Sequence, residues 1–434
     1  MKAKTKKRVI LTLALAIIMT CAMSITAFAS GAPTGLRQTE STTTSFTVEW
    51  NAVPGADGYF VYKSKDNVNW VPIWNKWEDA NDNGLPECDA NVTNCKTSLY
   101  LQPGTTYYVR VVPAYSLGPF SYSKGTPSAS IAVVTTPNDV NKVTQTKASS
   151  KGVTIKWSPV AGATSYNIYC SDDNDKKVAS TKNTSVTIKQ TAGTKKKYLV
   201  CPVRTSGTFS AEGSKTTASL YGGGAVQAKS VPRQPVYVAN SKKENLAWDL
   251  KTNKVTLSAD KHNKDMTCDG FQYVIYSANG KKKLKTTVKD RWTDVTFKLK
   301  AVKNAGFQVM ARGYTTINGK KYYGAWSAKQ VVIPQPVVKV PDGIHTSTAT
   351  IKWSKISGAT KYYVYVAKNY SSPFATKNYK RVATVNAKKT SYKISGLKKG
   401  RYYSVYVVPV VKIGKKSYKG VAGKYTWEGY RSNY

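Results

Sequence analysis

Most of the chain alternates apolar and polar residues over short runs, and Gly, Pro, Asn and Ser separate one run from the next. Alternation with a period of two is typical of half-buried β-strands. It predicts strands over residues 46–50 and 59–62, and then a turn that leads into a long strand within residues 101–111. Because no long segment beyond residue 30 has the spacing of an amphipathic helix, we expect an all-β chain.

One pattern recurs three times along the chain: a strand that ends in Trp, a Gly-Ala turn, and a second strand that carries Tyr. The tryptophans of the three copies are Trp50, Trp157 and Trp353, which are 107 and 196 positions apart. The second interval is about twice the first, so it predicts a further, degenerate copy. A period of about 100 residues is the length of a β-sandwich and exceeds the ~20–50 residues of solenoid and propeller repeats.

The first copy continues into a corner of the form Leu-x-Pro-Gly-Thr-x-Tyr over residues 101–107, followed by alternating valines. Together with Trp50, this corner resembles the fibronectin type III domain. The resemblance implies a sandwich of a three-stranded and a four-stranded sheet, with Tyr107 before the penultimate strand. Trp50 can fill the core, and Tyr107 can bury its ring while its hydroxyl bonds the backbone across the turn.

The other copies match this pattern to different degrees. The fourth repeats the corner with Tyr403, whereas the second has Lys196 there, which removes the hydroxyl from that corner. In the third, Leu257 replaces the tryptophan and residues 307–309 replace the tyrosine corner. The third copy also contains Asn318-Gly319, which predicts a tight hairpin of the mirror-turn kind.

The predicted fold class is all-β, with four tandem immunoglobulin-like (fibronectin type III) β-sandwiches after an N-terminal signal peptide. A run of glycines over residues 222–224 predicts a flexible linker with a hinge near Gly223. The predicted segments are a signal peptide over 1–29, a first domain with a Trp-rich loop insertion over 30–137, a second over 138–224, a degenerate third over 225–336, and a fourth over 337–434.

The N-terminus is typical of an export signal, because basic residues precede the apolar run 9–19 and a small-residue site, Ala27-Phe28-Ala29, precedes Ser30. The apolar run is shorter than the ~20 residues that a membrane-spanning helix needs. We therefore expect a secreted, extracellular protein without a membrane span, either soluble or associated with a cell wall.

Charge is distributed unevenly along the chain. The net charge is −3 over residues 31–140, +9 over 141–225, +14 over 226–336 and +18 over 337–434. A positive field of this size concentrates polyanions, and the release of their counterions makes binding sensitive to salt. The alternative is a lysine-rich surface that only keeps the protein soluble.

Five cysteines follow the predicted signal peptide, and export permits disulfides. Cys88 and Cys95 fall in one loop and can close it. Cys170 and Cys201 fall on strands that we expect to be neighbours in the second unit. Cys268 is left over, although spacing alone does not fix the pairing.

The sequence lacks the motifs that are typical of catalytic sites. Its two histidines, His262 and His345, have no cysteine or carboxylate at ligand spacing, and there is no Gly-x-Ser-x-Gly or phosphate-binding glycine loop. The fourth unit has only Asp342 and Glu428 for acid–base work. We therefore expect a protein that is not an enzyme.

An insertion in the first unit has the opening of a calcium loop. Asp79, Asn81 and Asn83 provide oxygen ligands at the first, third and fifth positions, and Gly84 stands at the sixth. Asp89 lies one step before the position of the closing carboxylate. The sequence therefore leaves two readings, a calcium site or a solvated turn, and we expect no other cofactor.

Three further tryptophans, Trp70, Trp74 and Trp77, precede that insertion. Flat aromatic faces stack on sugar rings or on the apolar surface of a partner, which makes these residues candidate ligand contacts. The alternative is that they cover the edge of the sandwich, since aromatic residues are favoured on strands.

A second candidate site lies in the fourth unit. If one set of alternating residues points into the core, the other set, Tyr363, Tyr365 and Tyr406, points to the outer face, among lysines and arginines. Aromatic rings interleaved with cations suit an anionic glycan or nucleic acid, although cross-strand tyrosine pairing for stability explains the pattern too. The inward positions are Tyr362, Val364, Tyr403, Val405 and Val407.

These observations favour a secreted, non-enzymatic adhesion or binding protein of a bacterial surface or matrix. Its basic C-terminal modules would hold an anionic cell-wall polymer or polysaccharide, and its N-terminal module would present a loop to a host or bacterial surface glycan or protein. The alternative is a structural spacer or accessory subunit of a secreted carbohydrate-degrading complex. A fold of this kind hosts many functions, so the choice rests on the sites.

Overall fold

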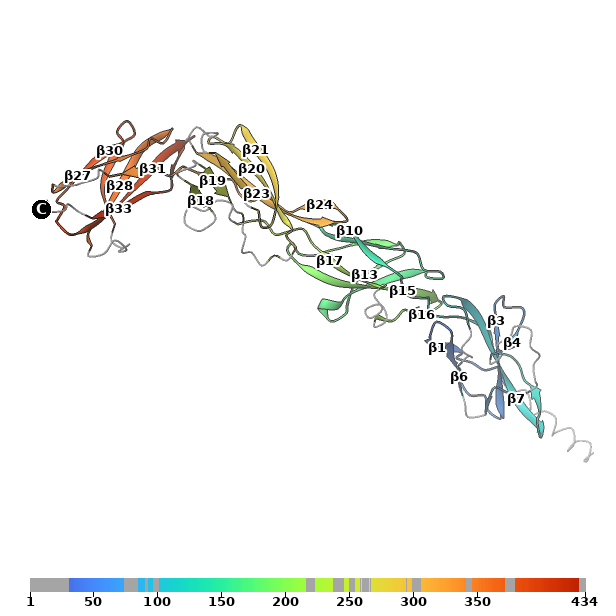
Figure 1. Cartoon of the computed structure of the whole chain (residues 1–434). Coiled ribbons are helices and arrows are strands. Elements are labelled where there is room, and N and C mark those ends of the chain that lie inside the picture. The colour runs from blue at the N-terminus through green and yellow to red at the C-terminus, as the bar shows by residue number, and fades with distance from the viewer. Residues whose placement is uncertain are drawn as a thin grey trace, which may run out of the picture. The chain divides into compact units, whose positions relative to one another are not determined.

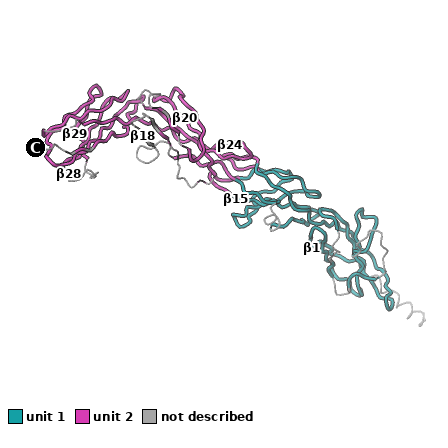
Figure 2. Tube along the Cα trace, in the orientation of Figure 1, with its two compact units in different colours: residues 1–145, 155–188, 196–228 teal, residues 146–154, 189–195, 229–434 magenta. Residues whose placement is uncertain are grey.

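The computed structural model shows a chain of β-strands (Figure 1), which group into two compact units (Figure 2). One unit comprises Met1–Gln145, Ile155–Ile188 and Lys196–Ala228, and the other comprises Thr146–Thr154, Lys189–Lys195 and Lys229–Tyr434. The structure describes residues 31–73, 85–89, 93–96, 101–215, 223–236, 246–249, 254–257, 259, 265, 267–293, 295–298, 306–340, 346–370 and 379–428.

The first sandwich packs a three-stranded sheet on a six-stranded sheet. Between them, Trp50 meets Tyr59 edge to face with ring centroids 5.3 Å apart, and Val48 and Val109 are fully buried. The smaller sheet has the order β1 (Arg37–Ser41), β2 (Phe46–Glu49), β6 (Asn94–Lys96). The larger sheet has the order β4 (Val71–Pro72), β3 (Gly58–Ser64), β7 (Thr106–Gly118), β8 (Ser121–Lys124), with β5 (Cys88–Asp89) beside β3 and β9 (Ile131–Val134) beside β7.

The second sandwich repeats this order, and its Trp157 meets Tyr166 edge to face at 5.3 Å. A short 3-10 helix, η1 (Ser171–Asp173), follows one of its strands. The smaller sheet has the order β10 (Val143–Ser149), β11 (Gly152–Trp157), β14 (Ser185–Ile188). The larger sheet has the order β13 (Lys176–Thr181), β12 (Ser165–Cys170), β15 (Lys195–Ser206), β16 (Phe209–Glu212), with β17 (Ala225–Lys229) beside β15.

The position of β17 corrects the predicted boundary at residues 224/225 and the predicted hinge near Gly223. The strand pairs with β15, so it completes the second sandwich rather than opening the third. The backbone N–H of Val200 donates to the carbonyl of Gly224 at 2.8 Å. A Cβ on Gly223 would lie 2.4 Å from the carbonyl oxygen of Val140. Gly223 therefore serves a close backbone approach, which only glycine permits.

The third sandwich confirms the degenerate copy. Leu257 is fully buried where the other copies have Trp, and the predicted hairpin turn has positive φ at both Asn318 (48°) and Gly319 (77°). The smaller sheet has the order β18 (Leu246–Asp249), β19 (Lys254–Leu257), β22 (Val295–Lys298). The larger sheet has the order β21 (Lys283–Asp290), β20 (Gly270–Ser277), β23 (Phe307–Ile317), β24 (Lys320–Tyr323), with β25 (Gln330–Val332) beside β23.

The fourth sandwich has the same order again, and Trp353 meets Tyr362 edge to face at 5.4 Å. The smaller sheet has the order β26 (Val338–Lys339), β27 (Thr348–Trp353), β30 (Ser391–Ser395). The larger sheet has the order β29 (Lys380–Asn386), β28 (Ala359–Tyr370), β31 (Tyr402–Ile413), β32 (Lys416–Lys419), with β33 (Gly423–Glu428) beside β31.

Each sandwich also holds a buried tyrosine whose hydroxyl accepts a backbone hydrogen bond from the loop before its strand. This bond ties the loop to the core, including in the third sandwich, which lacks the tryptophan. The four bonds run from Val53 N to Tyr59 (2.8 Å), from Val160 N to Tyr166 (2.9 Å), from Ala259 N to Tyr273 (3.0 Å) and from Ile356 N to Tyr362 (2.8 Å).

The corner tyrosines behave as the resemblance implies. The hydroxyl of Tyr107 accepts from Gln102 N at 3.0 Å, and that of Tyr403 accepts from Lys398 N at 2.6 Å. In the second sandwich Lys196 instead bonds Asp173, with 2.6 Å between Nζ and Oδ2. This ion pair joins the start of β15 to η1, so it does not replace the hydroxyl bond of the corner.

The predicted signal peptide, residues 1–29, lies outside the described residues. In the part of the chain that the structure describes, no helix has the length and apolarity needed to cross a membrane.

Candidate functional site

The larger sheet of the fourth sandwich has an apolar inner face and a cationic, aromatic outer face. Tyr362, Val364 and Tyr403 are fully buried in the core, as the alternation predicts. Tyr363, one position on from Tyr362, is half-buried on the opposite face. Tyr365 shares that face, because it follows Tyr363 at the strand period of two.

Three cations from three strands surround the ring of Tyr363. The Nζ of Lys361 in β28 lies 5.3 Å from the ring centroid, the Cζ of Arg381 in β29 lies 4.9 Å from it, and the Nζ of Lys419 in β32 lies 5.8 Å from it. A cation within about 6 Å of a ring is attracted by the negative face of the π-system. The ring thus draws these three positive charges together.

Tyr406 forms the second half of this outer face. It lies directly opposite Tyr365 on one side and Lys424 on the other. The Nζ of Lys424 is 4.7 Å from the ring centroid of Tyr406, and the ring of Tyr379 stacks on it with centroids 3.7 Å apart. Burial raises the pKa of the Tyr379 hydroxyl, so this ring stays neutral at physiological pH. We call Lys361, Tyr363, Tyr365, Tyr379, Arg381, Tyr406, Lys419 and Lys424 the cationic face.

Among the residues that the structure describes, no acidic side chain forms an ion pair with a cation of the cationic face. Residues 337–434 contain only Asp342 and Glu428 as acidic side chains. Among the described residues, the ion pairs join Arg37 to Glu49, Lys196 to Asp173 and Lys229 to Asp269, and none involves a cation of the fourth sandwich. The charges of the face therefore remain available to an external anion.

The predicted aromatic site of the first sandwich is organised differently. The guanidinium carbon of Arg110 lies 4.3 Å from the ring centroid of Trp70 and 5.5 Å from that of Tyr62. The Nζ of Lys124 lies 4.7 Å from the ring centroid of Phe60. Burial lowers the pKa of Arg110. Trp70 thus stacks on an internal cation, while Trp74 and Trp77 lie outside the described residues.

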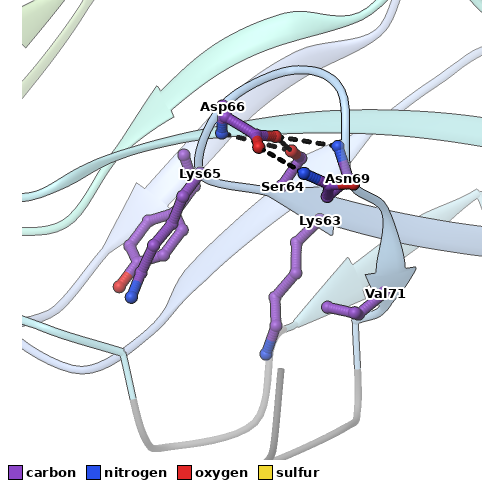
Figure 3. Close-up of a pocket in the computed structure, with 7 residues that line it drawn as sticks. Lys63, Ser64, Lys65, Asp66, Asn69 and Val71 are labelled. Atoms are coloured by element: carbon purple, nitrogen blue, oxygen red, sulfur yellow. Dashed lines mark hydrogen bonds between the residues drawn. The ribbon is translucent and has the colours of Figure 1, made fainter. Parts of the chain in front are cut away.

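A cavity of about 200 Å³ lies beside the turn after β3 (Figure 3). The carboxylate of Asp66 accepts bonds from Val68 N at 2.9 Å and Asn69 N at 2.8 Å, and from the Ser64 hydroxyl at 2.8 Å. The Nζ of Lys63 donates to the carbonyl of Ile73 at 3.4 Å. These polar groups build the turn itself, so the cavity does not combine them into a reactive site.

The candidate calcium loop is not placed by the structure. Asp79, Asn81 and Asn83 lie outside the described residues, as do His262 and His345. The backbone of Asp89 is described as part of β5, but its side chain is not. No group of three or more potential metal ligands occurs within the described residues, so calcium binding stays a prediction.

Cys170 and Cys201, the second pair of disulfide candidates, do not face each other in this fold. Their strands, β12 and β15, are neighbours as expected. The register, however, places Cys170 opposite Tyr198 and Cys201 opposite Asn167. The two positions differ by three residues, which turns their side chains to opposite faces of the sheet. A disulfide needs Cα atoms within about 7 Å and Cβ vectors that converge.

The sequence predicts the outward positions of Tyr363, Tyr365 and Tyr406, but neither the place of Tyr379 nor those of the individual cations. Lys361 was within reach, because it lies two positions before Tyr363 on the same strand. Arg381 comes from the neighbouring strand β29 and Lys419 from β32, which lies beyond β31, and their places depend on register. A bulge between Val364 and Tyr365 shifts that register against β29, and alternation along one strand carries no signal of it.

The first sandwich is similar in sequence to a known domain family, and one solved structure also matches the chain. The family model named Fibronectin type III domain matches residues 31–128. Among solved structures, the FN1–FN3 domains of chicken CNTN1 match at 14% sequence identity, covering 92% of this chain and 99% of that chain, with a TM-score of 0.19. At that TM-score the second match carries no argument. The match covers the first sandwich, and the other three sandwiches repeat its strand order, so the chain is a tandem of β-sandwiches of one topology.

Proposed function

We propose that the protein is a secreted, non-enzymatic binding protein whose fourth sandwich holds an anionic polymer on its cationic face. The observation that carries the proposal is the grouping of Lys361, Arg381 and Lys419 around Tyr363, in a segment with a net charge of +18. Four aromatic rings and four cations on one sheet face suit a chain of repeated negative charges, since charge supplies attraction and the rings supply flat contact area.

The ligand class follows from this chemistry. Phosphodiester polymers of a cell wall and acidic polysaccharides both repeat an anionic group along a flexible chain. Such ligands release counterions on binding, which favours association at low salt. The Trp-rich loop of the first sandwich is the proposed second contact, directed at a surface glycan or protein.

The test compares the full chain with a variant in which Arg381 and Lys419 are both changed to Gln. Binding is measured by calorimetry to polyphosphate, polygalacturonate and uncharged dextran at fixed salt. The control variant changes Lys176 and Lys177 to Gln, which removes two exposed lysines from the outer strand β13 of the second sandwich.

We expect the Arg381→Gln, Lys419→Gln variant to bind at least one anionic polymer about tenfold more weakly than the unaltered chain, on the order of 0.5–1 kcal/mol for each exposed contact. The control variant should lose much less. Equal losses in both variants would assign binding to overall charge. Absence of binding to every anionic polymer would leave the array as a spacer.

A further inference from the structure

Two cysteines of the first sandwich sit on opposite sheets and face the same core. Cys88 in β5 lies directly opposite Tyr59, and Cys95 in β6 lies directly opposite Val48. Residues directly opposite in an antiparallel pair share a face of their sheet. Because Tyr59 and Val48 are fully buried, both cysteine side chains project into the space between the sheets.

The two thiols are also close to each other. Cys88 is a member of the core cluster of the first sandwich, and Cys95 packs against that cluster. The thiol of Cys88 lies 3.9 Å from the carbonyl oxygen of Asn94, the residue before Cys95. A hydrogen bond between the two thiols, together with burial, raises the pKa of Cys95 above its ordinary range.

The other described cysteines lack such a neighbour. Cys170 and Cys201 lie on opposite faces of one sheet. The thiol of Cys268 in the third sandwich donates to the carbonyl of Gly270 at 3.3 Å. Among the cysteines that the structure describes, Cys88 and Cys95 are therefore the two whose side chains converge.

We propose that Cys88 and Cys95 form a disulfide that joins the two sheets of the first sandwich. The two S–H bonds break and one S–S bond forms. The two protons and two electrons pass to an external disulfide, such as oxidised glutathione, which leaves as two thiols after a mixed-disulfide intermediate. The bond closes a short loop and links β5 to β6, so it constrains the unfolded chain.

The burial of Cys88 and the partial burial of Cys95 determine when the bond can form. Exchange requires a thiolate and access to the oxidant. In the folded sandwich Cys88 is 7% exposed, so oxidation takes place before the core closes. Once formed, the bond is shielded from reductants by the same packing.

The first test maps the disulfide in the full chain. Reduced, denatured protein is refolded with a mixture of reduced and oxidised glutathione, and its thiols are then blocked with N-ethylmaleimide in denaturant without reductant. Tryptic cleavage leaves Cys88 and Cys95 in one peptide, so a protease that cuts before Asp89 is needed to separate them. Mass spectrometry then identifies labelled and cross-linked peptides.

We expect the peptides with Cys88 and Cys95 to be unlabelled and joined, and the peptides with Cys170, Cys201 and Cys268 to carry the label. Label on Cys88 and Cys95 after refolding with oxidised glutathione would overturn the proposal. A cross-link between either of them and another cysteine would also overturn it.

A second measurement reads the effect on stability. In calorimetry, refolding without an oxidant should lower one transition of the unaltered chain by about 10 °C, from the loop-closure entropy of a short loop. Cys95→Ser should show the lower transition under both conditions. The matched control, Cys201→Ser, should keep the response to oxidant. If the oxidant raised the transition of Cys95→Ser as much as that of the unaltered chain, the proposal would be contradicted.

Discussion

At the scale of single residues, buried tyrosines do two things at once in this protein. Each supplies a large apolar ring to the core, and its hydroxyl accepts a backbone N–H that the loop would otherwise leave unpaired. Tyr107 does this at the corner of the first sandwich, with 3.0 Å between its hydroxyl and Gln102 N. An unsatisfied buried donor costs more than the bond contributes, so the hydroxyl matters beyond its size.

We predict that Tyr107→Phe destabilises the first sandwich by about 1–3 kcal/mol, because it leaves Gln102 N without its acceptor. Urea denaturation of the full chain, followed on the transition of that sandwich, measures the loss. Tyr108→Phe is the matched control, since Tyr108 is on the opposite face of the same strand. Equal effects of the two substitutions would contradict the role of the corner hydroxyl.

The role of Tyr363 in binding can be tested by separating its ring from its hydroxyl. Tyr363→Leu removes the ring that draws Lys361, Arg381 and Lys419 together, so polymer binding should fall severalfold while the fold is retained. Tyr363→Phe keeps the ring and should bind as the unaltered chain does. Calorimetric titration with polyphosphate distinguishes the two. If Tyr363→Phe lost as much affinity as Tyr363→Leu, the hydroxyl rather than the ring would be the contact.

At the scale of elements, the sequence predicts strands and turns where a short local motif specifies them. The Trp, Gly-Ala and Tyr pattern located three sandwiches, and Asn318-Gly319 located a hairpin of the third. The glycines of residues 222–224 predict a linker before β17, whereas in the structure Gly223 allows the chain to pass close to Val140 and β17 joins the second sandwich. Such an approach depends on distant residues, so composition does not reveal it.

In the candidate sites too, local features can be predicted from the sequence, whereas features that depend on pairing between strands cannot. Alternation along β28 identified Tyr363 and Tyr365 as outward residues, because the strand period is a local property. The cations from β29 and β32 depend on register and on a bulge, and the faces of Cys170 and Cys201 depend on how β12 meets β15. Pairing between strands is set by the whole fold, and the sequence of one strand does not state it.

The turn after β3 should respond to acid in a defined window. Hydrogen bonds from Asn69 and Val68 lower the pKa of Asp66 below its ordinary value of 3.8. Since the folded pKa is lowered, the turn is fully stabilised above pH 4 and loses that stabilisation as the pH falls further. Amide shifts of Val68 and Asn69, followed by NMR from pH 6 to pH 2, should stay constant until below pH 4.

Asp290 provides an internal comparison for that titration, because bonds from Thr293 and Trp292 lower its pKa as well. Its amide neighbours should also stay constant above pH 4. A transition of the Val68 and Asn69 shifts with a midpoint at pH 4 or higher would show that the carboxylate of Asp66 is not held by the turn.

At the scale of the whole molecule, charge differs between modules that share one fold. The net charge runs from −3 over residues 31–140 to +18 over residues 337–434, while strand order changes little. The net charge of a sandwich does not determine its fold. The charge can therefore differ between sandwiches according to what each one binds. The fold supplies a rigid sheet, and the outward positions of that sheet differ between sandwiches.

The dependence of polymer affinity on salt tests this account most directly. The affinity of the full chain for polyphosphate should fall linearly in a plot of log K against log salt, with a slope set by the counterions released. Changing Arg381 and Lys419 to Gln should make the slope shallower by about one to two, whereas changing Lys176 and Lys177 to Gln should leave it unchanged. Identical slopes for the two variants would contradict a binding site on the fourth sandwich.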